Sequence, residues 1–145
     1  MVTRKTLYNF FQEFATNHSQ INTFFYGDLF DVSQSADTIY PLMAVVPTPS
    51  NVVGVQVKMG YTVVIGDRVS KDRENAVNVE NDTFQICLDL LAALDVQSNG
   101  WELESSATIT PFREDWKDLI DGHTFDVGLN IDFDYNSCQI PQKNT

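Results

Sequence analysis

The stretch Thr124-Phe-Asp-Val-Gly-Leu-Asn-Ile-Asp-Phe-Asp-Tyr135 decides the fold of this chain. Apolar residues alternate in it with polar residues or glycine over ten consecutive positions. A period of two over this length predicts a strand with one face in a core and the other in water. The pattern therefore predicts an antiparallel sheet that is covered on one side only. The predicted core face consists of Phe125, Val127, Leu129, Ile131 and Phe133.

The opposite face of the same strand carries Asp126, Asp132 and Asp134 and no basic residue. Calcium loops wrap one ion with closely spaced ligands and a glycine turn. A straight strand instead separates successive residues on one face by roughly 7 Å. We therefore interpret the three aspartates as a solvated acidic face, and we expect no metal there.

Length and composition indicate one ordinary domain. The 145 residues include 43% hydrophobic and 17 aromatic side chains, enough for a core without disulfides or metals. No internal repeat or linker interrupts the chain, so we predict a single α+β domain over residues 1–145. The two cysteines, Cys87 and Cys138, are too few for a disulfide framework, and we expect both to stay reduced.

The charge is strongly negative and unevenly distributed. Nine basic and 20 acidic side chains give a net charge of −11. Residues 1–72 contribute −1 and residues 73–145 contribute −10. Such a surface repels nucleic acid phosphates, although solubility alone explains the charge equally well. No apolar run suits a signal peptide or a membrane span, so we expect cytoplasmic synthesis and no membrane partner.

Two amphipathic helices are predicted from apolar residues at helical spacing, one at 3–18 and one at 78–95. The second has so broad an apolar stripe that we expect it to be largely buried. Strands are expected at 21–32, 39–46, 52–66, 101–110 and 124–134. The architecture is then a two-layer α+β sandwich, with both helices on one face of an antiparallel or mixed sheet.

The connections are predicted from proline, glycine and charged residues. We expect a loop at 33–37, a turn at 47–51, a bulge at Gly60, and a loop with one helical turn at 111–122. The mixed-charge segment 67–80 is predicted to be a polar arm, ordered only against a neighbouring molecule. The tail is predicted to fray beyond Cys138.

No motif in the sequence specifies a reaction. His18 and His123 have no other ligand at metal-binding spacing, and no serine stands in a nucleophile elbow. Glu102 and Glu104 share one side of a predicted strand and could form an acid/base pair, but exposed strand carboxylates are far commoner. We therefore predict a protein that is not an enzyme and holds no cofactor.

Four segments have the order and pattern of a known family. They are the first helix at 7–14, the strand pair at 42–46 and 53–65, the helix Asp82-Thr-Phe-Gln-Ile-Cys-Leu-Asp-Leu-Leu-Ala-Ala-Leu94, and Ile109-Thr-Pro-Phe-Arg-Glu-Asp-Trp-Lys-Asp-Leu-Ile-Asp-Gly-His-Thr-Phe125. In this arrangement the chain resembles the tail-terminator and neck-ring proteins of tailed bacteriophages. The ending Asn136-Ser-Cys-Gln-Ile-Pro141 resembles structural proteins of crAss-like gut phages.

The resemblance implies a structural virion protein, made in the host cytoplasm, that joins the capsid and portal to the tail. It implies a homo-oligomeric head-to-tail connector ring of six or twelve copies, with other neck, portal or tail proteins as partners. DNA would pass through the ring without specific binding, because an acidic lumen makes no phosphate contacts. The alternative is an adaptor or binding module with no role in a virion.

Two groups of residues are candidates for these roles. The subunit interface is predicted to use β-edge pairing with Phe24, Phe25, Tyr26, Trp116, Arg68, Lys71 and Arg73, since aromatic residues are enriched at interfaces. Packing within the subunit's own core is the alternative for each aromatic residue. The acidic lumen face is predicted to consist of Asp126, Asp132 and Asp134.

Overall fold

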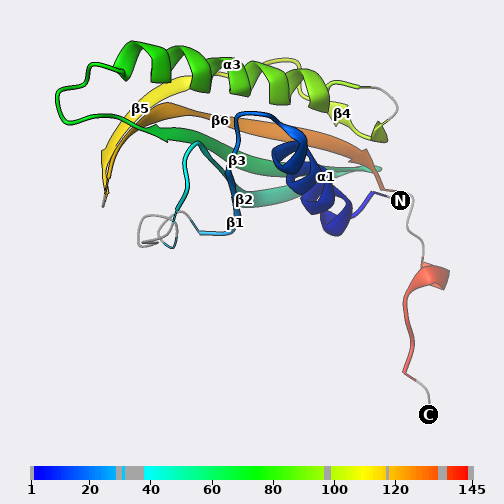
Figure 1. Ribbon diagram of the computed structural model, residues 1–145. Coiled ribbons are helices and arrows are strands. Elements are labelled where there is room, and N and C mark those ends of the chain that lie inside the picture. The colour runs from blue at the N-terminus through cyan, green and yellow to red at the C-terminus, as the bar shows by residue number, and fades with distance from the viewer. Residues whose placement is uncertain are drawn as a thin grey trace.

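The computed structural model describes residues 2–28, 31, 38–96, 99–116, 118–133 and 137–143 (Figure 1). In chain order the elements are α1 (Arg4–Asn17), β1 (Thr23–Tyr26), β2 (Leu42–Val53), β3 (Gln56–Arg68), α3 (Ala76–Leu94), β4 (Glu102–Leu103), β5 (Thr110–Asp115), β6 (Leu119–Asp132) and the 3-10 helix η2 (Ser137–Gln139). The described part is thus an α+β fold with two α-helices and a six-stranded sheet, as the sequence predicts.

The sheet is mixed and does not close. Its strand order is β1-β2-β3-β6-β4. β5 pairs with the same side of β6 as β4 does: β5 pairs with the first half of β6, and β4 pairs with the second half. The pairing of β1 with β2 is parallel, and the other pairings are antiparallel. β1 therefore forms one edge of the described sheet, and β4 and β5 share the other.

The long pairing of β3 with β6 forms the centre of the molecule. Its register joins Val57 to Ile131 and continues to Arg68 opposite Ile120. Phe125, Val127, Leu129 and Ile131 are buried in the main core, so the predicted inner face is confirmed for these four residues. Phe133 follows the end of β6 and is 41% exposed, so the prediction is wrong for this residue, which lies beyond the strand pairing.

Both helices cover the same face of the sheet. Thr3 and Thr6 form a reciprocal cap at the start of α1, and Trp101 Nε1 donates to the carbonyl of Leu94 at the end of α3. These hydrogen bonds satisfy backbone groups that a helix end leaves unpaired. One core cluster contains residues of both helices, from α1 Leu7, Phe11 and Ala15, and from α3 Ile86, Cys87, Leu90 and Leu94.

The other face of the sheet has no helix over it in the described part. It carries a small cluster of Leu42, Ala44 and Val64, with four half-buried aromatic residues packed against it, Phe25, Tyr40, Phe112 and Trp116. We call this side the open face. Towards the far end of β6 it is polar, with Thr62, Asp126 and Asp132.

Three predicted connections are wrong. Residues 47–51 continue β2, with a register shift opposite Gly60, and the hairpin turn is instead at Gly54 and Val55. β3 runs through Gly60 in unbroken register with β6, so the irregularity lies in β2 and not in β3. Of the strand expected at 101–110, Glu102–Leu103 forms β4 and Thr110 begins β5. The loop expected at 111–122 is the β5–β6 hairpin.

Residues 67–80 are tied to the domain at several points. Val69 is buried, and the Asn75 side chain accepts from Ser70 N and donates to the carbonyl of Arg68. The segment then enters α3 at Ala76. Whether it also contacts a neighbouring molecule remains a prediction. Residues 137–143 are exposed, and the loop expected at 33–37 lies outside the described residues.

Candidate functional site

The predicted acidic face lies on the open side of the sheet. Asp126 and Asp132 are both exposed, and Asp126 accepts a hydrogen bond from Thr62 Oγ1 at 2.5 Å. Asp132 is 3.5 Å from Gln56 Nε2. Asp134 lies outside the described residues. The two described carboxylates thus share a face that a neighbouring molecule can approach, and their place in a lumen remains a prediction.

The predicted aromatic interface residues divide between the two faces. Phe24 and Tyr26 of β1 lie on the helix side, with ring centroids 6.0 and 5.0 Å from that of Tyr8 on α1. Phe25 and Trp116 pack on the open face. All four are half-buried, so each contributes to packing within the subunit and keeps an exposed part for a neighbour.

Two of the three predicted basic interface residues have partners within the chain. Arg68 pairs with Asp118 at 3.0 Å, and its guanidinium lies 5.9 Å from the centroid of the Tyr40 ring. Arg73 pairs with Asp121. Lys71 is exposed in the turn between β3 and α3. Arg68 and Arg73 therefore fix the ends of this turn.

Three buried polar residues, which the sequence did not single out as a group, lie between α3 and β6. Thr83, Asp121 and His123 are the buried polar or charged residues of the described part of the chain. Asp121 pairs with Arg73, and its Oδ1 is 3.4 Å from Arg113 Nε. Thr83 and His123 bond to each other, Oγ1 to Nδ1, at 2.9 Å.

The tautomer of His123 follows from its contact with Thr83. The Thr83 hydroxyl donates its one hydrogen to the carbonyl of Val79, at 2.8 Å. Oγ1 must therefore accept from His123, so Nδ1 carries the ring proton. Burial lowers the pKa of His123, which keeps the ring neutral near pH 7. Nε2 is then a hydrogen-bond acceptor, and it has no hydrogen-bond partner among the described residues.

A cleft of about 560 Å³ opens beside this histidine. Glu80 and Asn81 are its other polar residues, and the Phe84 ring stands edge-on to the imidazole, with centroids 5.4 Å apart. We call it the His123 cleft; it is lined by Val77, Glu80, Asn81, Phe84, Ile109, Pro111 and His123. An apolar slot with an unpaired acceptor at its base can bind a hydrogen-bond donor on an apolar stem.

A pattern in the sequence could have indicated this site. Extending the alternation of β6 backwards from Phe125 places His123 and Asp121 at core-facing positions. Polar residues at such positions need buried partners. The partners Thr83 and Arg73 are 40 and 48 residues away in the chain, so no local motif joins them.

The lowered pKa of His123 predicts a loss of stability in mild acid. The unfolded chain takes up a proton below about pH 6.5, whereas the folded histidine resists it, so the free energy of unfolding falls as pH falls through this range. Burial raises the pKa of Asp67, which acts in the opposite direction at lower pH. His123→Asn keeps a donor for Thr83 and should flatten the fall between about pH 7 and 5.5 in urea titrations. An equally steep fall in the variant would contradict the assignment.

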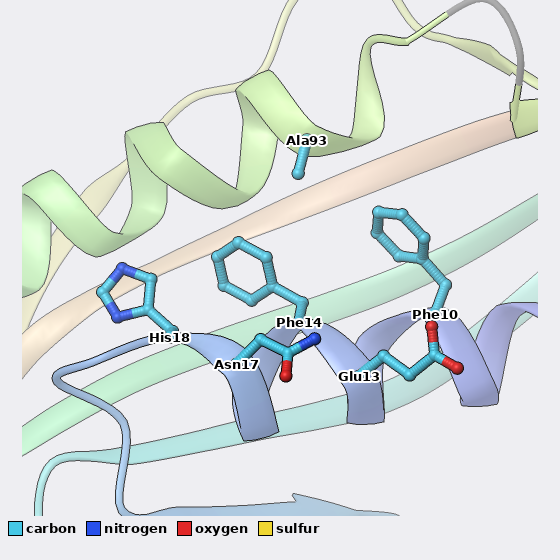
Figure 2. Close-up of a pocket in the computed structure, with 6 residues that line it drawn as sticks. All are labelled: Phe10, Glu13, Phe14, Asn17, His18 and Ala93. Atoms are coloured by element: carbon cyan, nitrogen blue, oxygen red, sulfur yellow. The ribbon is translucent and has the colours of Figure 1, made fainter.

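A second concave region lies between the two helices (Figure 2). Phe10 and Phe14 point from α1 towards Ala93 on α3, and the groove has a volume of about 350 Å³. His18 Nε2, at its end, is 2.9 Å from Asp89 Oδ2. These contacts join α1 to α3 across the surface of the core.

The described residues contain no group of three or more histidine, cysteine, aspartate or glutamate side chains placed to hold a metal ion. Cys87 is fully buried, and burial raises the pKa of its thiol to about 12, so it is no nucleophile at neutral pH. Within the described part, no helix is long and apolar enough to cross a membrane.

No protein-family model matches the chain, and no curated protein is significantly similar to it.

Proposed function

We propose that this chain is the subunit of a ring in the neck or tail terminator of a bacteriophage virion, joining the capsid and portal to the tail around the DNA passage. The resemblance of its segments to that family motivates the proposal. The observation that carries it is the open sheet, whose two edges differ in length and chemistry. One edge is the aromatic strand β1, and the other includes β5, which carries Arg113, Glu114 and Asp115.

Unlike edges favour a ring over a simple dimer. If β1 of one copy pairs with β5 of the next, the interface is heterologous, and repeating it gives a closed ring when the rotation closes. The amide of Thr23 donates to the carbonyl of Pro41, just before β2, and the amide of Gly27 donates to the carbonyl of Val45 in β2. By the period of two, the amides of Phe24 and Tyr26 point away from β2, towards the free edge. No strand of the described part pairs with this edge of β1, so these amides can pair with a neighbouring strand.

The acidic open face suits a channel that DNA slides through. Asp126 and Asp132 give this face carboxylates, and the nearby cation Lys58 is paired with Glu104. Binding of DNA depends on cations that neutralise phosphates and release counterions, and unpaired cations of this kind are absent from the described part of this polar face. DNA would therefore pass without being retained.

The ring is tested by light scattering and electron microscopy of the purified protein. We expect six or twelve copies, with Asp126 and Asp132 facing the central hole. Phe24→Pro removes an outward amide of β1 and should reduce the assembly to monomers. The matched Phe24→Ala loses the same ring but keeps the amide, so it should still assemble. A monomeric parent protein would refute the ring and leave the adaptor function; equal assembly of both variants would refute pairing through β1.

A further inference from the structure

We propose that the His123 cleft receives a lysine or arginine side chain of a partner protein other than this chain. The inference does not depend on the ring. It rests on three features of the cleft: an unpaired acceptor, apolar walls and an acidic rim. The buried core residues of α3, which are Ile86, Cys87, Leu90 and Leu94, lie outside the cleft lining.

The acceptor is Nε2 of His123. The ring is 5% exposed, and its other nitrogen is fixed as a donor by Thr83. His123 lines the cleft, so a donor that enters the cleft can reach this nitrogen. A partner side chain that brings an N–H group to Nε2 would satisfy it and would exclude water from the cleft.

The walls suit the aliphatic stem of a long cationic side chain. Ile109, Pro111 and Val77 are apolar, and Phe84 offers an aromatic ring on which a cation can rest. Phe84 is 41% exposed and Val77 is 76% exposed, so a partner has access to both. They continue along α3 to Leu88, 40% exposed, as an apolar stripe at helical spacing.

The charge around the cleft selects a cation. Glu80 lies on the rim, and α3 carries Glu80, Asp82 and Asp89 but no basic residue between Ala76 and Leu94. Arg73 and Arg113 both pair with Asp121. A second copy of α3 would bring the same three carboxylates, so charge favours a basic partner of different sequence over self-association.

The test uses the full-length protein labelled with 15N at its two histidines, whose ring signals can be resolved even in a large assembly. Near pH 7.5, the spectrum should show His123 as the Nδ1–H tautomer with a free Nε2. The probe is n-butylammonium, which imitates the end of a lysine side chain. Titration should shift the Nε2 signal saturably in the millimolar range. Butyrate, with a similar short alkyl chain and the opposite charge, should not shift it.

Glu80→Gln should weaken n-butylammonium binding roughly two- to fivefold, the range for an exposed ion pair. The matched control Glu74→Gln removes an exposed charge just before α3, outside the cleft, and should leave binding unchanged. An Nε2–H tautomer, a response that does not saturate, or equal binding of butyrate would overturn the cation site. A His123 signal that shifts with protein concentration alone would show that a second copy fills the cleft, which would overturn the choice of partner.

Discussion

Leu129→Asp is expected to unfold most of the protein at neutral pH. Leu129 is 0% exposed, lies opposite Met59 in the central strand pair, and belongs to the core that both helices cover. A carboxylate there would have neither water nor a cation beside it. The cost is roughly 4 kcal/mol or more, a large part of the stability of an ordinary domain. Urea titration monitored by circular dichroism measures the loss.

Asn130→Asp is the matched control. It introduces the same carboxylate one residue later in β6, where the side chain is half-exposed and lies on the opposite face of the strand. Its cost should stay within about 1 kcal/mol, as is usual for surface substitutions. If the two variants lost equal stability, the faces of β6 would be wrongly assigned. If Leu129→Asp melted like the parent, the core itself would be misplaced.

The elements with long, regular patterns were predictable from sequence. Both helices and β6 can be predicted because their apolar residues recur at a regular spacing, which keeps them facing one core over the whole element. β5 shows no such pattern, because its residues are exposed except for the half-buried Phe112. Its proline and charges were therefore interpreted as a loop.

Proline misled the prediction at 47–51 for a physical reason. β1 pairs only with Leu42 to Val45, so beyond that point β2 has a free edge in the described part of the sheet. A proline whose missing N–H would face this free edge removes no hydrogen bond between strands, so β2 can continue through Pro47 and Pro49. The true turn, at Gly54 and Val55, lies in an apolar run without the usual turn residues, apart from the glycine at φ 58°.

The candidate sites were predicted unevenly. Asp126 and Asp132 could be assigned to the solvent face from alternation alone, because a strand fixes which side each residue faces. Alternation also places His123 on the core side of β6, but the cleft itself depends on how α3 packs on β6 and on the tautomer set by Thr83. A site made by contacts across 40 residues of chain is visible only after folding.

Gly122→Ala should be nearly as damaging as the buried charge, although it adds only one methyl group. Gly122 lies opposite Gly66 in the β3–β6 pair, and a Cβ on it would stand 1.9 Å from the carbonyl oxygen of Ile65. That oxygen is backbone in the central strand, so it can give way only if the two strands separate locally. We expect a loss of about 3 kcal/mol or more, beyond ordinary overpacking of side chains.

Gly128→Ala separates this steric effect from the general effect of replacing glycine. Gly128 is in the same strand and on the same face, but the atoms nearest to its Cβ would be the ends of the Glu104 and Lys58 side chains, at 2.5 to 2.8 Å. Those ends can swing into solvent at the cost of an exposed ion pair, about 1 kcal/mol or less, and alanine regains part of this by restricting the unfolded chain. Thermal and urea unfolding of the two variants should therefore differ by about 2 kcal/mol or more. Equal stabilities would mean that β3 and β6 do not approach each other as closely at Gly122 as the register requires.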